Sequence, residues 1–200
     1  MKRGEQKKIN FKKIALIVLF SISLTIFILL FSYKMTVQFS HLTIEQRSAV
    51  SFLENKAAVN PSYTATEISH LEDAKIVLLI ADYAFYISLL LCTLIIAMYE
   101  RKRAELRQFF FWGGVTTIAV MSFVLIFIFA DFNLAFVTFH KIFFPQGNWI
   151  FSTDSLLIQT FPESFFVLMG KRIFLQAFFW GSLFIVLAFY LRHVYHKKSS

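Results

Sequence analysis

The sequence predicts an all-α membrane protein with four transmembrane helices and two long extracytoplasmic loops. Hydrophobic residues make up 58% of its 200 residues, whereas soluble domains contain roughly 45–50%. They gather in four runs of about 20 residues, the length that crosses a hydrocarbon core about 30 Å thick. Backbone amides in lipid need partners within their own segment, so each run should be a helix. The runs span residues 14–33, 76–98, 109–130 and 173–191.

A single membrane domain accounts for residues 1–200, because the sequence outside the runs could bury little further core. Six basic residues precede the first run, as in a secretory signal. The apolar stretch is too long for a signal, however, and no small-x-small cleavage site follows in SYKMTVQFSH. We therefore expect residues 14–33 to remain as an anchor.

The distribution of Lys and Arg predicts the orientation. The two tails and the connection at 99–108 carry 13 of the 20 basic residues against three acids. The connections at 34–75 and 131–172 carry seven basic residues against eight acids. Basic connections stay in the cytoplasm, so both termini should be cytoplasmic and the two long loops should face outward. The net charge of +8 is then a topology signal, and no nucleic-acid partner is expected.

Each outer loop is about forty residues long, and connections of that length are usually functional or disordered. Thr43–Asn55 in the first loop reads as a short amphipathic helix. The second loop contains the aromatic stretch FVTFHKIFFPQGNWIF, which we expect to lie at the headgroup level or against the helices. If the protein is catalytic, we therefore expect its active site on the outer side of the membrane.

His70 is the first candidate catalytic residue. Ser69 and Glu72 match a capping box at the start of the second membrane helix, which would place His70 in its first turn. The helix dipole there disfavours imidazolium, so His70 should be neutral and able to accept a proton. Asp73 follows one turn later and could orient the ring. The alternative is an interfacial histidine beside a solvated acid.

His140 is the second candidate, because an imidazole is unusual in so apolar a segment. It could act chemically or merely anchor the loop at the headgroups. Phe143, Phe144 and Trp149 flank His140 and should hold this loop over the lipid. His41, in the first outer loop, is a weaker third candidate.

Asp82 lies inside the second run, where a carboxylate is costly and suggests either a function or a structural polar contact. Tyr83 or Tyr86 could donate hydrogen bonds to neighbouring helices. Gly113 and Gly114 lie inside the third run and indicate close helix packing.

The single Cys92 excludes a disulfide framework within the chain. The sequence contains no G-x-S-x-G elbow, zinc helix, phosphate-binding glycine loop or Cys cluster, so no cofactor and no metal are expected.

Three stretches resemble one family: EISHLEDAK (67–75), FHKIFFPQGNWIF (139–151) and DSLLIQTFPESFF (154–166). They are similar to the His-Leu-x-Asp-Val, Phe-His-x-x-Phe-Phe, Trp-x-Phe, Asp-x-Leu-Ile and Phe-Pro-Glu-x-Phe-Phe pattern of the bacterial lipoprotein intramolecular transacylases, which are four-helix integral membrane proteins. Ala74 replaces the usual Val and Leu157 the usual Ile. Three blocks in this order on this topology are a fairly specific match.

The resemblance implies a membrane acyltransferase of the bacterial cell membrane, with its active site on the extracytoplasmic side. It would move the sn-2 acyl chain of a diacylglyceryl lipoprotein onto the amine of the lipoprotein's own N-terminal cysteine, giving a lyso-form lipoprotein. The family's two functional histidines correspond to His70 and His140. Membrane lipids and the lipoprotein substrate are the implied partners, and Phe143, Phe144 and Trp149 would contact the substrate.

Two other classes of function remain open from the residues alone. One is a metal-dependent membrane hydrolase with His70, Asp73 and His140 as ligands, whose activity a chelator would remove. The other is a non-enzymatic membrane scaffold or transport accessory, in which the histidines would be dispensable.

Overall fold

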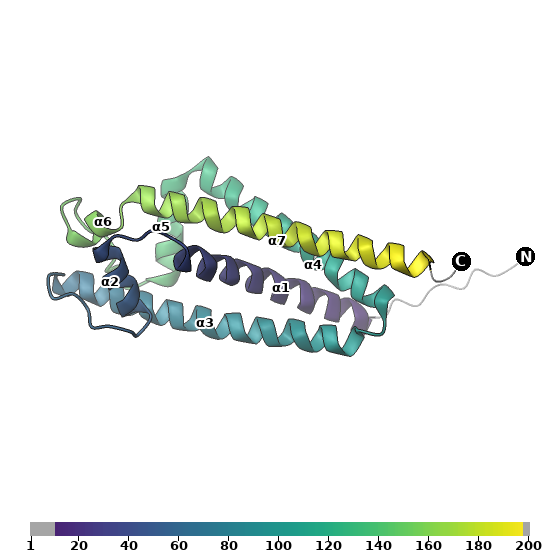
Figure 1. Cartoon of the computed structure of the whole chain (residues 1–200). Coiled ribbons are helices and arrows are strands. Elements are labelled where there is room, and N and C mark those ends of the chain that lie inside the picture. Colours follow the sequence, from purple (N-terminus) through teal and green to yellow (C-terminus); the bar gives the residue numbers. More distant parts are fainter. Residues whose placement is uncertain (1–10, 198–200) are drawn as a thin grey trace, which may run out of the picture.

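The computed structural model describes residues 11–197, and every regular element in that range is a helix (Figure 1). Four helices are long and apolar enough to cross a membrane. Three shorter helices lie between them in the chain. The seven helices are α1 (Phe11–Gln38), α2 (Ile44–Leu53), α3 (Ala65–Tyr99), α4 (Arg103–Ala130), α5 (Phe132–Phe143), α6 (Leu156–Thr160) and α7 (Glu163–Lys197).

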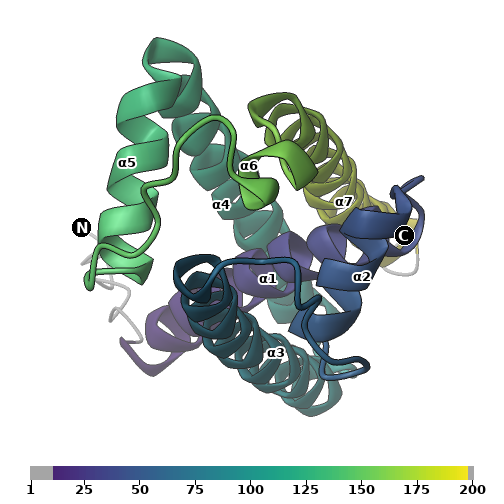
Figure 2. The same ribbon diagram turned by 90° about the vertical axis from the view of Figure 1, so that its left-hand side faces the viewer.

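The first helix occupies the centre of the bundle. Seen from one end, α1 passes between α3 on one side and α4 and α7 on the other (Figure 2), and it contacts all three. Its buried face is formed by Phe20, Leu24 and Ile28, each at most 1% exposed. The apolar core continues onto the other three long helices through Cys92, Ile95, Phe109, Met121 and Ala177.

The glycine pair of α4 allows the close helix packing expected from the sequence. A Cβ on Gly113 would come within 2.7 Å of Leu24 Cδ2 of α1. On Gly114 it would come within 2.6 Å of the Gly181 carbonyl oxygen of α7. The neighbouring Thr117 lies 3.1 Å from Thr25 of α1, hydroxyl to hydroxyl. Small side chains on α4 thus bring two helices against it at once.

Gly114→Ala is expected to destabilise the bundle, because its new methyl group would meet backbone atoms of α7 that cannot rotate away. Overpacking of this kind costs about 1–3 kcal/mol. Gly170→Ala is the matched control: it lies inside α7 with open space around its Cα, and alanine favours a helix by about 1 kcal/mol. Thermal unfolding in detergent should show a lower midpoint for the first variant only. Equal midpoints would contradict the packing.

The segments expected to be loops are largely helical. Residues 34–75 contain the end of α1, all of α2 and the first turns of α3, and residues 131–172 contain α5, α6 and the start of α7. The short amphipathic helix expected at Thr43–Asn55 is observed as α2. Local capping explains why these segments are helical, because a side-chain oxygen accepts a backbone N–H at the start of four of the helices. The N-cap residues of α2, α3, α5 and α6 are Thr43, Thr64, Asp131 and Ser155.

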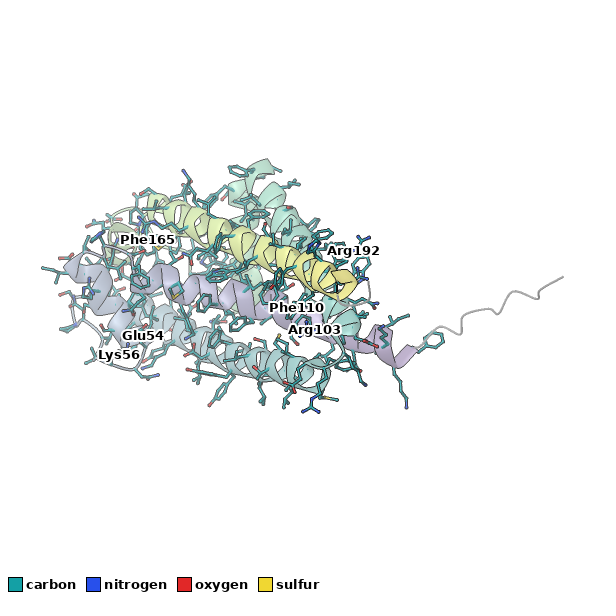
Figure 3. The ribbon with its side chains drawn as sticks, turned by 45° about the vertical axis from the view of Figure 1, so that its right-hand side comes forward. Glu54, Lys56, Arg103, Phe110, Phe165 and Arg192 are labelled. Atoms are coloured by element: carbon teal, nitrogen blue, oxygen red, sulfur yellow. The ribbon has the colours of Figure 1, made fainter. Side chains whose placement is uncertain are left out.

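The short helices gather at one end of the bundle (Figure 1), over a second apolar cluster. This cluster joins α2, α3, α6 and the α2–α3 link through Phe52, Tyr63, Leu71 and Leu157. Figure 3 places Arg103 and Arg192 towards the other end, away from Glu54 and Lys56. The two ends of the bundle therefore differ: one is covered by folded connections and the other by a short basic turn.

Candidate active site

The fold brings together the two histidines that the sequence singled out. His70 lies on α3 and His140 on α5, with their ring centroids 6.1 Å apart and their planes inclined by 27°. Both side chains are half-buried, whereas His41 is exposed in the link between α1 and α2. The pair lies at the end of the bundle that carries the short helices, before the apolar part of α3 begins.

The start of α3 differs from the expectation. Thr64 is the N-cap, and it exchanges hydrogen bonds with Glu67, whose carboxylate accepts the Thr64 N–H at 2.7 Å. The capping box predicted at Ser69 and Glu72 is therefore wrong, and the helix begins at Ala65. His70 lies in the second turn, where the helix dipole has little influence.

A tertiary contact explains why the helix begins at Thr64. The Glu67 side chain is only 1% exposed, and its second oxygen, Oε1, accepts the Leu157 N–H of α6 at 2.8 Å. Burial acts to raise the pKa of this carboxyl, but the hydrogen bonds from Leu157 and Thr64 outweigh it and hold the pKa below its ordinary value. Glu67 therefore stays charged and ties the first turn of α3 to α6.

Helix α5 fixes the ring of His140. Asp131 separates α5 from α4 and caps α5, since its carboxylate accepts the Leu134 N–H at 2.9 Å. His140 lies in the last turn, with Nδ1 2.8 Å from the Phe136 carbonyl oxygen. A carbonyl oxygen can only accept, so Nδ1 carries the proton. Nε2 is then the nitrogen available to take or give one.

Aromatic rings surround both imidazoles. The ring of Phe144 lies 4.7 Å from that of His70 and 5.5 Å from that of His140, centroid to centroid, and its side chain is 4% exposed. Trp149 packs against His140 at 4.9 Å. Phe143, in contrast, is 45% exposed. Of the three aromatic residues expected to contact lipid, Phe143 is the one with an exposed side chain, and the other two pack against the imidazoles.

These surroundings lower the pKa of both histidines. Burial is the main cause for His70 and the positive charge of His140 adds to it, while Asp73 and Asn148 act in the opposite direction. For His140, burial again dominates and the Phe136 carbonyl opposes it. The neutral form of each ring therefore persists to lower pH than in a free histidine. Near neutral pH the site offers two proton acceptors side by side.

Asp73 holds the turn that follows α5. Gln146 Nε2 donates to its Oδ2 atom at 2.5 Å, and Asn148 Nδ2 donates to the same oxygen at 2.6 Å. Gly147, between the two amides, adopts a φ of +81°, which glycine allows without strain. Sequence reasoning missed Gln146 and Asn148, although two amides separated by a single residue in an aromatic stretch were a usable signal.

The comparison with known families decides the classification. The family model described as lipoprotein intramolecular transacylase Lit matches residues 11–166. The chain belongs to this family. The match confirms the resemblance noted in the sequence. Among curated proteins, none was found to match.

Solved structures of the membrane integral lipoprotein intramolecular transacylase from Bacillus cereus share the fold. One has a TM-score of 0.80 at 20% identity, covering 96% of this chain and 100% of the other. Two others, each with one histidine replaced, have TM-scores of 0.79 and 0.78 at 19% and 20% identity. They cover 94% of this chain and 95% and 96% of their own. The predicted fold class, an all-α protein with four transmembrane helices, is confirmed.

Membership of the transacylase family also establishes the class of activity. The protein is a membrane-integral enzyme, a transferase that moves an acyl group within a lipoprotein. The predicted function and enzyme class are confirmed at this level. The substrate is accordingly a lipoprotein in a membrane.

Two further features of this transacylase concern candidates outside the histidine pair. Asp82 pairs with Lys34 of α1 at 2.5 Å, whereas Tyr83 and Tyr86 are exposed. An ion pair between two membrane helices accounts for this intramembrane carboxylate as a structural contact. Within residues 11–193, no group of three or more His, Cys, Asp and Glu side chains is arranged to hold a metal ion.

Proposed function

We propose that this protein transfers the sn-2 acyl chain of a diacylglyceryl lipoprotein to the amine of the lipoprotein's own N-terminal cysteine, with His70 and His140 as catalytic residues. The observation that carries the assignment is the pair of imidazoles, whose ring centroids lie 6.1 Å apart. His70 comes from the start of α3, and His140 comes from α5. Over that distance, one ester group can contact both rings.

The reaction requires proton transfers but no nucleophile from the enzyme. The cysteine ammonium loses a proton and the amine attacks the ester carbonyl carbon, which forms the C–N bond. The C–O bond to the glyceryl oxygen then breaks. Two protons leave the nitrogen in total and the glyceryl oxygen gains one, so one proton is released. Each transfer by a positioned imidazole contributes about 10²–10⁴-fold to the rate.

Because their pKa values are lowered, His70 and His140 are both neutral at the start of the cycle, and each can accept a proton. His70 takes one proton from the cysteine nitrogen and passes it to water. His140 takes the other and delivers it to the departing glyceryl oxygen. While protonated, His140 also stabilises the negative oxygen of the tetrahedral intermediate, and this attraction is stronger than in water because the neighbouring aromatic rings screen charge less. Both reacting groups belong to one substrate, so holding them together contributes much of the remaining rate.

The proposed location of the site is the outer headgroup level, with both termini in the cytoplasm and residues 1–200 forming a single membrane domain. Support comes from the position of His70, which precedes the apolar run of α3, and from the basic turn at Arg103 at the far end of the bundle. The basic tails at residues 1–10 and 198–200 lie outside the described residues. Phe143, exposed on α5 three residues after His140, is the proposed contact for the acyl chain.

Cysteines introduced at Asn55 and Arg103 test this orientation. Both positions are exposed, so labelling depends on the side of the membrane and not on burial. The native Cys92 is buried and should remain unlabelled. In intact cells an impermeant thiol reagent should label the cysteine at position 55 and leave the one at 103 unmodified until the cells are opened. The reverse pattern would place the site in the cytoplasm.

The proposed reaction can be tested with purified protein in vesicles. Two synthetic diacylglyceryl lipopeptides are mixed, one with an isotope-labelled sn-2 chain and the other with a different peptide. Fragment mass spectra should show the label moved from glycerol to the α-amine of its own peptide only. Transfer of the label to the second peptide, or loss of the chain as free fatty acid, would contradict intramolecular transfer.

A further inference from the structure

Asn148 follows α5 in the chain and contacts α3 at the residues that flank His70. Its Nδ2 atom donates to Asp73 Oδ2 at 2.6 Å and to Ser69 Oγ at 3.0 Å. Ser69 and Asp73 are four residues apart, on one face of α3, so both reach the same amide. A carboxylate can only accept hydrogen bonds, so the Asn148 nitrogen must face Asp73 and its oxygen must face the other way.

Two buried atoms at this point have no hydrogen-bond partner among the described residues: His70 Nδ1 and Asn148 Oδ1. One is an oxygen that accepts, and the other is a donor whenever Nδ1 carries the proton. Leaving either atom unpaired is unfavourable, because a buried polar atom loses its hydrogen bonds to water. Asn148 already acts on the imidazole, since it opposes the decrease in the pKa of His70 that burial causes.

We propose that Asn148 is the positioning residue of His70: its Oδ1 accepts the Nδ1–H of the imidazole, and Asp73 acts on His70 through it. The His70 lone pair is then held on Nε2, the nitrogen that takes the proton from the substrate. His140 has the same arrangement, because the Phe136 carbonyl holds its Nδ1–H at 2.8 Å. In both rings Nε2 is therefore the nitrogen that exchanges a proton with the substrate. The inference rests on the proposed role of His70 as a base.

Gln146 provides a matched control. It donates to the same oxygen of Asp73 at 2.5 Å and belongs to the same turn. It has no hydrogen bond to His70 among the described contacts, and its side chain is exposed. If the amides served only to hold the turn, Asn148 and Gln146 would be equivalent.

The test compares Asn148→Leu with Gln146→Leu in the full-length protein. Asn148→Leu should lower kcat for a synthetic diacylglyceryl lipopeptide by about 10²-fold or more with little change in KM, because a wrong tautomer in a catalytic triad costs up to about 10⁴-fold. Gln146→Leu should stay within about threefold of the unchanged protein, and Asp73→Asn, which keeps an acceptor oxygen for Asn148, should lie between them. Imidazole ¹⁵N NMR should show the Nδ1–H tautomer of His70 in the unchanged protein and in Gln146→Leu, and mixed tautomers in Asn148→Leu.

If Asn148→Leu does not fold, the NMR spectrum of the unchanged protein still tests the proposal, because it reports which nitrogen of His70 is protonated. A His70 ring protonated on Nε2 there would overturn the proposal, as would equal losses of kcat in Asn148→Leu and Gln146→Leu. These outcomes leave the proposed function intact as long as His70→Ala is inactive. If His70→Ala is active, the proposed function fails first and Asn148 positions no base.

Discussion

Replacing His70 by alanine is expected to lower the yield of N-acyl, lyso-form lipopeptide by about 10²–10⁴-fold. The imidazole is the group assigned to accept a proton from the cysteine nitrogen, and neither neighbour in the turn can do so, because Gln146 and Asn148 carry neutral amides. The protein should still reach the membrane, since His70 is not among the residues that form the apolar core of the four long helices. Product is measured by fragment mass spectrometry at matched protein levels.

His41→Ala is the control for this loss. His41 is also a histidine in a connection between helices, but its side chain is exposed and the fold does not bring it to the pair. Its activity should equal that of the unchanged protein. Normal product from His70→Ala would remove His70 from the mechanism, and inactive His41→Ala would make His41 the next candidate.

Replacing His140 by glutamine should have the second large effect, again about 10²–10⁴-fold in turnover. A glutamine amide can donate a hydrogen bond near the position of Nε2 but cannot carry a proton to the glyceryl oxygen. Binding of the lipopeptide should therefore persist while turnover is lost. Phe144→Ala should instead weaken both by a modest factor, because Phe144 supports the rings and carries no proton.

His140→Gln also has a predicted effect on His70. The positive charge of His140 lowers the pKa of His70, so its removal should raise that pKa towards the ordinary value of about 6.5. NMR titration of the His70 ring in both proteins measures the shift. A lower pKa in the variant would contradict the proximity of the two rings. Active His140→Gln with inactive Phe144→Ala would mean that the loop is a structural lid and that the second proton carrier lies elsewhere.

The membrane helices and the histidine pair could be predicted from local sequence. Long apolar runs have few physical alternatives to a membrane helix. His70 and His140 were recognisable because imidazoles are unusual within apolar or aromatic segments, and the family resemblance selected the same two.

The details of the site depend on tertiary contacts and could not be predicted in this way. Two capping patterns compete at the start of α3, Thr64 with Glu67 and Ser69 with Glu72. The bond from Glu67 to the Leu157 N–H, 90 positions away in the chain, favours the first. Asp73 lies one turn from His70, yet its carboxylate faces two amides from the turn after α5. No local pattern reveals such a partner.

The most direct test of the account is mass spectrometry of lipoprotein N-termini from bacteria that lack any such transacylase and express this protein. With the unchanged protein, the N-terminal cysteines should carry one acyl chain on the amine and one on the glycerol. With His70→Ala or His140→Gln at equal levels, they should carry a free amine and two glyceryl chains. Diacylglyceryl termini with the unchanged protein, or N-acyl lyso-form termini with both variants, would contradict the account.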